Sequence, residues 1–220
     1  MVRAVSFDLD GTLYSSEPII EDAYREAVIE FNKLYDKSLI PPTFSQIESL
    51  IGQPVYKIYK TLFPGLTEEE ISIIGSTIIN ILTSKILREG GLLFDGVKDV
   101  FYWLNSNNYM VFIASNGRRE YIDAVLNKFD LVCMPFVCIG EKGIAKKSDI
   151  LFYYMKEYNI SSSEMIMVGD RKSDIEAARE AGVKFVGCLF GHGDPNEIDG
   201  SDFFIKDITE IKDVIGKVYA

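Results

Sequence analysis

Residues 5–12 read VSFDLDGT, a short apolar run that stops at two aspartates and a glycine. A buried parallel strand that ends in a loop gives this pattern. Asp8 and Asp10 stand two residues apart at the expected strand end, so their side chains leave the same face and their charges crowd together. A hard cation would compensate these charges, and sparse carboxylates with room for waters and phosphate favour magnesium. The alternative for this stretch alone is a solvated acidic turn.

A second apolar run followed by acids occurs at residues 165–174, MIMVGDRKSD. Asp170 comes directly after the expected strand, and two acidic strand ends in one parallel sheet are placed to converge on one ion. Asp170 is therefore a candidate metal ligand. Asp174 falls in the first turn of the next expected helix, where an acid either belongs to the site or merely complements the helix dipole.

A third apolar run, residues 111–117, reads VFIASNG and lies between the two acidic ones. It ends in Ser115, Asn116 and Gly117, which offer a hydroxyl and free backbone amides ahead of an expected helix. Such a strand end is suited to hold a phosphate group. The alternative is a serine N-cap followed by a turn glycine.

Two adjacent lysines, Lys146 and Lys147, open the helix that precedes the second acidic run. Cations at a helix start oppose the helix dipole, and local rules of this kind are broken most readily at functional sites. A cation is also needed where a carboxylate attacks a phosphate. A solvated lysine pair is the alternative.

Hydrophobic periodicity divides the chain into two regimes. From residue 16 to residue 88 the pattern is helical, with Pro18 in a first turn and a last helix that begins with a capping box at Thr67 and Glu70 and ends at Gly90. Afterwards strands alternate with helices. The expected strands lie near 109–114, 131–138, 164–169 and 183–189, and the expected helices near 96–107, 118–128, 147–158 and 171–181.

This alternation predicts an α/β fold with a Rossmann-like parallel sheet whose helices cover both faces. The helical block is then an insertion after the first strand. We expect a core domain formed by residues 1–14 and 91–220, and a helical domain formed by residues 15–90.

The charge balance bears on partners and location. With 23 basic and 33 acidic residues the net charge is −10, which disfavours a nucleic-acid partner. No charge-free apolar run reaches the length of a membrane span, and no signal-peptide core is found near Met1. Three cysteines, Cys133, Cys138 and Cys188, have no framework spacing and suit a reducing compartment. We expect a cytoplasmic protein with no membrane partner, a monomer by default and a dimer as the alternative.

The segments DLDGT, a serine that ends the next strand, a lysine, and GDRKSD follow one another in an order that resembles the four motifs of the haloacid dehalogenase-like superfamily. The resemblance spans nearly the whole chain, and its first motif is specific. The helical insertion looks like the C1 cap of that superfamily. The layout as a whole is similar to the phosphoglycolate phosphatase-like branch.

The resemblance implies that Asp8 is a nucleophile that forms an aspartyl phosphate, and that Asp10 protonates the leaving oxygen and then activates water. It also implies Mg²⁺ as the cofactor, with a backbone carbonyl of Asp10 among its ligands. The metal ligands expected on this basis are Asp8, Asp10, Asp170 and Asp174.

The phosphate-binding residues follow from the same resemblance. Ser115 would bind the transferring phosphoryl group together with Asn116 and Gly117, and a lysine would hold it beside the nucleophile. The Pro-x-Pro stretch that commonly follows this lysine in the superfamily is missing here. We favour Lys147, because KSDIL resembles the proline-free variant of the branch, and Lys146 is the alternate.

The predicted activity is that of a phosphoric monoester hydrolase acting on a small phosphorylated metabolite. A sugar-phosphate mutase of the same superfamily is the nearest alternative, and a receiver-like phosphoacceptor or a non-catalytic protein is the alternative from another class. Phosphoglycolate, sugar phosphates, nucleoside monophosphates and pyrophosphate all remain open as substrates. The segment IGQPVYK, residues 51–57, resembles the cap loop of the branch, although its Gly52 and Pro54 also suit a helix end and a helix start.

Overall fold

The computed structural model describes residues 1–218 of the chain, which fold into two compact units. Unit 1 contains Met1–Tyr14, Leu93–Asn116 and residues 130–218. Unit 2 contains Ser15–Leu92 and Gly117–Phe129. The strands β2 (Tyr14–Ser15) and β3 (Leu92–Leu93) form a two-stranded sheet at two of the points where the chain passes between the units.

Unit 1 is built on a five-stranded parallel sheet with the strand order β4-β1-β5-β6-β7. Its strands are β1 (Ala4–Phe7), β4 (Met110–Ile113), β5 (Met165–Gly169), β6 (Lys184–Cys188) and β7 (Phe203–Ile205). The central strands β1 and β5 are buried along their whole length, which is why their sequences are continuous apolar runs. The predicted Rossmann-like parallel sheet is confirmed.

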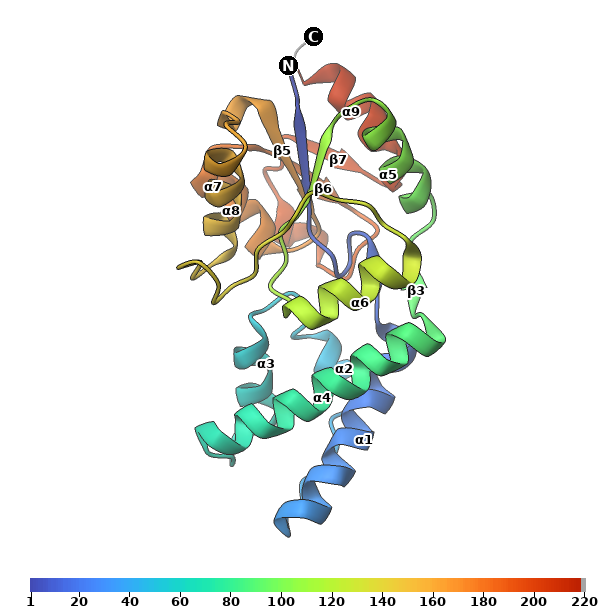
Figure 1. The fold of residues 1–220 in the computed structure, drawn as a ribbon, viewed down its shortest axis with the longest axis vertical. Coiled ribbons are helices and arrows are strands. Elements are labelled where there is room, and N and C mark those ends of the chain that lie inside the picture. Colours follow the sequence, from blue (N-terminus) through green and yellow to red (C-terminus); the bar gives the residue numbers. More distant parts are fainter. Residues whose placement is uncertain (219–220) are drawn as a thin grey trace. The chain divides into compact units, whose positions relative to one another are not determined.

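Helices cover both faces of this sheet. Figure 1 shows α7 and α8 beside one face, and α5 and α9 beside the other. The bounds are α5 (Val97–Ser106), α7 (Lys147–Glu157), α8 (Lys172–Ala181) and α9 (Ile211–Lys217), with short 3₁₀ turns η1 (Ser162–Glu164), η2 (Pro195–Ile198) and η3 (Ile208–Glu210). The expected helices near 96–107, 147–158 and 171–181 are thereby confirmed.

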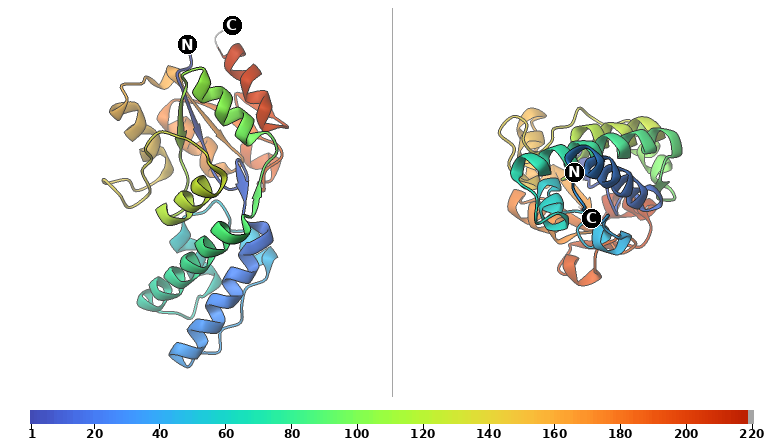
Figure 2. Two further views of the ribbon diagram at one scale, coloured as in Figure 1. Left: turned by 45° about the vertical axis from the view of Figure 1, so that its right-hand side comes forward. Right: turned by 90° about the horizontal axis from the view of Figure 1, so that it is seen from below.

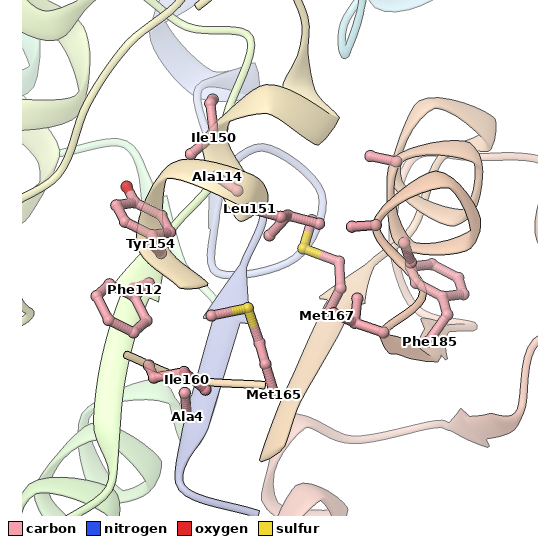
Figure 3. Close-up of a cluster of buried hydrophobic side chains, with 14 of the residues drawn as sticks. Ala4, Phe112, Ala114, Ile150, Leu151, Tyr154, Ile160, Met165, Met167 and Phe185 are labelled. Carbon is pink, nitrogen blue, oxygen red and sulfur yellow. The ribbon is translucent and has the colours of Figure 1, made fainter. Parts of the chain in front are cut away.

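A layer of large side chains joins α7 to the sheet. Figure 3 shows Tyr154 of α7 lying over Phe112 of β4, and the two rings stack with centroids 4.3 Å apart. The Tyr154 hydroxyl donates to the carbonyl of Ile113 over 2.6 Å and accepts the N–H of Val137 over 3.3 Å. This buried hydroxyl therefore ties the end of β4, just before Ser115, to the helix that begins at Lys147.

The strand expected near 131–138 is wrong, because the structure has no strand within that segment. Met134 donates one backbone hydrogen bond to Val111 over 2.8 Å, but Pro135 has no N–H to continue a ladder. The N–H of Val137 is bonded to the Tyr154 hydroxyl instead. The apolar residues of this segment are needed for the core beside β4, and they form an irregular edge rather than a sixth strand.

Unit 2 is helical, as expected for the insertion. Its helices are α1 (Glu17–Tyr35), α2 (Phe44–Glu48), α3 (Val55–Leu62), α4 (Glu68–Glu89) and α6 (Arg119–Phe129). Thr67 and Glu70 form the expected capping box of α4, and Gly90 follows its last residue. Figure 2 shows α1 and α4 side by side, and the buried ammonium of Lys85 in α4 pairs with Glu26 of α1 over 2.8 Å.

Helix α6 packs within unit 2, whereas the sequence grouped residues 118–128 with the core domain. Lys128 near its end donates to the carbonyls of Leu87 and Arg88, over 2.9 and 3.3 Å, and so caps the last turn of α4. A lysine that satisfies the free carbonyls of another helix gives no local sequence signal.

Helix α4 is long and apolar enough to cross a membrane by length and composition alone. Its apolar stripe, with Ile71, Ile74 and Ile78, is buried inside unit 2, where α4 packs against α1 and α6. A buried stripe of this kind is what a core helix of a globular unit presents.

We predict that Tyr154→Phe lowers the free energy of unfolding by about 1–3 kcal/mol, because it leaves a buried carbonyl and a buried N–H without their shared partner. Urea unfolding followed by circular dichroism measures the change. Tyr153→Phe is the matched control, since the Tyr153 hydroxyl bonds to the exposed ammonium of Lys142 and its loss should cost less than about 0.5 kcal/mol. Equal values for the two variants would show that the Tyr154 hydroxyl is not an anchor.

Candidate active site

The site lies at the carboxyl edge of the sheet in unit 1. Phe7 of β1 is paired with Ile113 of β4 on one side and with Val168 of β5 on the other. The residues that follow these three strands therefore emerge at neighbouring positions along one edge. Asp8, which follows β1, therefore lies between the ends of β4 and β5. Ser115 follows β4, and Asp170 and Asp174 follow β5.

A buried lysine joins two of the predicted carboxylates. Lys147 Nζ donates to Asp8 Oδ1 over 2.8 Å and to Asp174 Oδ1 over 2.5 Å, and all three side chains are shielded from solvent. Lys146 instead pairs with Glu180 on the surface. The structure thus brings Lys147, and not Lys146, to the expected nucleophile.

Asp174 contacts both the start of α8 and the lysine. Its Oδ2 accepts the backbone N–H groups of Asp170 and Arg171, over 3.2 and 3.0 Å, and so caps the first turn of α8. Its Oδ1 faces Lys147. One carboxylate therefore fixes the helix start and also orients the lysine.

Three buried carboxylates, those of Asp8, Asp170 and Asp174, bring one oxygen each within 4.8 Å of one another. Among the described residues, Asp8 Oδ2 is buried and has no hydrogen-bond partner. Against these three negative charges stands the single ammonium of Lys147. Excess negative charge and an all-oxygen donor set fit a hard divalent cation.

The excess of negative charge is also seen in the pKa values of Asp8, Asp170 and Lys147. Burial, reinforced by the charge of Asp174, raises the pKa of Asp8 to about 7 even though Lys147 opposes the shift. Burial and Asp174 likewise raise the pKa of Asp170 to about 7, against the amides of Gly193 and His192. Burial would lower the pKa of Lys147, but the carboxylates of Asp174 and Asp8 outweigh it and raise this pKa well above the usual range.

The other predicted site residues lie around this cluster in the chain. Ser115 is buried two residues beyond β4, next to Ala114, whose N–H bonds to the carbonyl of Phe7 over 2.8 Å. Asn116 is half-buried in the same unit, whereas Gly117 is the first residue of the second segment of unit 2. Asp10 is half-buried in the turn after β1, where it pairs through a bridge with Tyr14, and its carboxylate is outside the three-acid cluster.

Sequence reasoning missed the groups that hold Asp170. The Thr12 hydroxyl donates to Asp170 Oδ1 over 3.3 Å, and the N–H groups of His192 and Gly193 donate to its Oδ2 over 2.9 and 3.0 Å. Gly11 has a positive φ of 79°, and a Cβ there would lie 2.3 Å from Asp170 Oδ2. The available signal was the position of GTL and FGHG shortly after β1 and β6, the two strands that lie on either side of β5.

The chain belongs to the haloacid dehalogenase-like hydrolase family, whose model matches residues 5–188. This family assignment confirms the resemblance seen in the four motifs and the expectation that the protein is a hydrolase. The match begins in β1 and ends with β6, so it includes all three acids of the cluster and Lys147.

Individual relatives and solved structures agree with the family. The chain is 24% identical over 221 residues to a phosphoglycolate phosphatase of Vibrio parahaemolyticus, covering 97% of this chain and 96% of that protein. A crystal structure described as a predicted phosphoglycolate phosphatase from Haemophilus somnus is similar with a TM-score of 0.80 at 20% identity, over 97% and 98% of the two chains. A β-phosphoglucomutase from Clostridium difficile has a TM-score of 0.74 at 21% identity, over 100% and 97%. These structures share the fold.

We predict that the protein in EDTA becomes less stable as the pH rises from 5 to 8. Unfolded aspartates titrate near pH 4, whereas Asp8 and Asp170 titrate near pH 7 in the folded chain. Between these values the folded chain binds more protons than the unfolded chain, so the free energy of unfolding falls with rising pH. Each 1 kcal/mol lost lowers Tm by about 2–4 °C for a chain of this size, which differential scanning calorimetry resolves.

Asp8→Asn should flatten this pH dependence and raise Tm at pH 8, because it removes one buried charge. Asp213→Asn, which changes the net charge equally at an exposed position, is the control and should leave the slope as it is. A slope that is the same in all three proteins would assign the effect to the general acidity of the chain.

Proposed function

We propose that the protein is a magnesium-dependent phosphatase that hydrolyses a small phosphomonoester through an aspartyl phosphate on Asp8. The observation that carries this proposal is the Asp8 carboxylate itself. It is buried at a strand end, its Oδ1 is bonded to Lys147, and its Oδ2 has no partner among the described residues. The relatives named phosphoglycolate phosphatase support a phosphomonoester as the substrate class.

Lys147 holds the carboxylate of Asp8, the proposed nucleophile, in a fixed orientation. Phosphoryl transfer depends on positioning and charge compensation, because a carboxylate and a phosphate dianion repel each other. Lys147 fixes Oδ1 of Asp8 and leaves Oδ2 as the oxygen that would form the bond to phosphorus. The same ammonium would also offset part of the negative charge of the phosphoryl group.

Mg²⁺ held by Asp8, Asp170 and Asp174, with the backbone carbonyl of Asp10, would supply positive charge beside the transferring phosphoryl group. The three buried carboxylates with one oxygen each inside 4.8 Å support this ligand set. Burial and repulsion from Asp174 raise the pKa values of Asp8 and Asp170, and a divalent charge would favour the ionised forms.

The remaining steps fall to Asp10 and to the end of β4. We assign proton transfer to Asp10, which would protonate the leaving oxygen and then take a proton from the water that attacks the phosphorus of the aspartyl phosphate. The P–O bond to Asp8 breaks in that second step, and inorganic phosphate leaves with the carboxylate regenerated. Ser115, with Asn116 and Gly117, would bind the phosphoryl oxygens during both steps.

We assign unit 2 the role of a cap that supplies substrate specificity. Helix α3 begins after Pro54 as its N-cap, and Gly52 before it has a φ of 90°, so the segment IGQPVYK contains the turn before α3 and the first turn of that helix. Gln53 and Lys57, on either side of Pro54, are the polar residues of this segment that we propose to contact the substrate. We further propose that the protein is a monomer of the cytoplasm and that its substrate is a small phosphorylated metabolite.

We expect the purified chain to release inorganic phosphate from a panel of small phosphomonoesters only when Mg²⁺ is present. The measurement is a phosphate assay over phosphoglycolate, sugar phosphates, nucleoside monophosphates and pyrophosphate. Asp8→Asn should lower kcat by at least about a thousandfold, since the amide is a poor nucleophile. Asp213→Asn is the control with the same charge change, and it should retain the activity of the native chain.

Two results would contradict the phosphatase. Isomerised sugar phosphate in place of released phosphate, seen by ³¹P NMR, would make the protein a mutase. A folded protein that binds Mg²⁺ but turns over none of these esters would favour a receiver-like or non-catalytic role.

Asp10→Asn tests the acid and base role separately. The substitution removes the proton donor but leaves the backbone carbonyl in place, so kcat should fall by about 10²–10⁴-fold while Mg²⁺ binding is retained. Steady-state kinetics together with calorimetric titration of Mg²⁺ measure the two quantities. Full turnover in this variant would remove Asp10 from the mechanism.

A further inference from the structure

The loop that follows β6 lies with its backbone against Asp170. His192 and Gly193 donate their N–H groups to Asp170 Oδ2, over 2.9 and 3.0 Å. Thr12 donates its hydroxyl to Oδ1 over 3.3 Å. All three donors come from outside the turn that carries Asp170, so the orientation of this carboxylate is set by tertiary contacts.

Two glycines make this approach possible. A Cβ added at Gly191 would lie 2.3 Å from Asp170 Cβ, and one added at Gly193 would lie 2.1 Å from the carbonyl oxygen of Asp170. Both separations are far inside van der Waals contact, and the second involves backbone, which does not move aside as a flexible side chain does. Any larger residue at position 193 would therefore push the loop away from the carboxylate.

The far end of the loop is bonded back to the same turn. Arg171 donates to the carbonyl of His192 over 3.4 Å and pairs with Glu197 Oε2 over 3.4 Å. The same Glu197 accepts the N–H of Lys172 over 3.2 Å and the N–H of Asp194 over 3.4 Å. Glu197 thus connects the loop to the start of α8. Residues 190–197 therefore contact both the Asp170 carboxylate and the residues that follow it.

We propose that residues 190–197, which we call the clamp loop, are a positioning element for the divalent cation. The backbone amides of His192 and Gly193 fix the Asp170 carboxylate in the orientation that the cation requires. The proposal deepens the proposed function and rests on it, since the cation is the one assigned there to Asp8, Asp170 and Asp174. Gly193 and Glu197 act through Asp170, and neither is assigned a contact with the substrate.

The physical reason is repulsion among the three acids. Before a cation binds, the charges of Asp8 and Asp174 favour turning the Asp170 carboxylate away from them. Two N–H donors on Oδ2 oppose that rotation. Oδ1, whose contact with Thr12 is the longer one, is left as the oxygen with capacity for a cation. A ligand that is fixed in advance loses less conformational entropy on binding, and donors that orient a metal ligand typically contribute about 10–100-fold in metal affinity.

The test is calorimetric titration of MgCl₂ into the full chain and its Gly193→Ala variant, with no substrate present. We expect Gly193→Ala to bind Mg²⁺ at least about tenfold more weakly. At saturating Mg²⁺ its kcat should return to the native value, because no group that touches the substrate has changed. Gly216→Ala in α9, where an added methyl group meets open space, is the matched control and should bind Mg²⁺ as the native chain does.

Glu197→Gln provides a second variant should Gly193→Ala fail to fold. It removes the ion pair with Arg171 but keeps the side-chain shape, so we expect a smaller loss of Mg²⁺ affinity in a folded protein. Folded variants that both keep native Mg²⁺ affinity would overturn the clamp, as would a loss of kcat that saturating Mg²⁺ does not restore. A native chain that binds no Mg²⁺ would overturn both the clamp and the proposed metal site. A native chain that binds Mg²⁺ without releasing phosphate would contradict the phosphatase alone.

Discussion

The ion pairs of Lys147 are the interaction on which the rest of the site depends. A buried ammonium is tolerated only when charged partners satisfy its donors, and Lys147 has Asp8 after β1 and Asp174 in the first turn of α8. Removing the ammonium would leave two buried carboxylates without their cation, and breaking a buried ion pair in this way typically costs about 3–5 kcal/mol. The helix α7 must therefore begin where it does, against the carboxyl edge of the sheet.

The parallel sheet brings the acids of the site together and also buries them, which disfavours their ionised forms. Adjacent strand ends bring Asp8 and Asp170 to one edge, where burial removes the solvent that would screen them. Burial and the charge of Asp174 outweigh the hydrogen bonds from the clamp loop and from Lys147, so the pKa values of both acids are raised to about 7. The fold therefore holds carboxylates together whose ionised forms are disfavoured by burial and by one another.

The sequence predicted those features that local pattern determines. Apolar runs that end in acids or in Ser115 marked β1, β4 and β5, and the same runs located the cluster of Asp8 and Asp170. Features that depend on distant partners were not predictable in this way. Lys128 of α6 caps α4, and Tyr154 takes the N–H of Val137 that a strand at 131–138 would have used. Neither contact has a fixed spacing along the chain.

Lys146 and Lys147 show how little separates a site residue from a surface residue in sequence. Both stand at a helix start, and both are paired with carboxylates, but Lys146 meets Glu180 in solvent while Lys147 is shielded between two acids. An exposed pair contributes little, because water screens it and the side chains lose freedom in forming it. The buried pair is what gives Asp8 one fixed oxygen and one open oxygen. That asymmetry of a single carboxylate comes from the packing of α7 on the sheet, and the proposed role of Asp8 as a nucleophile rests on it.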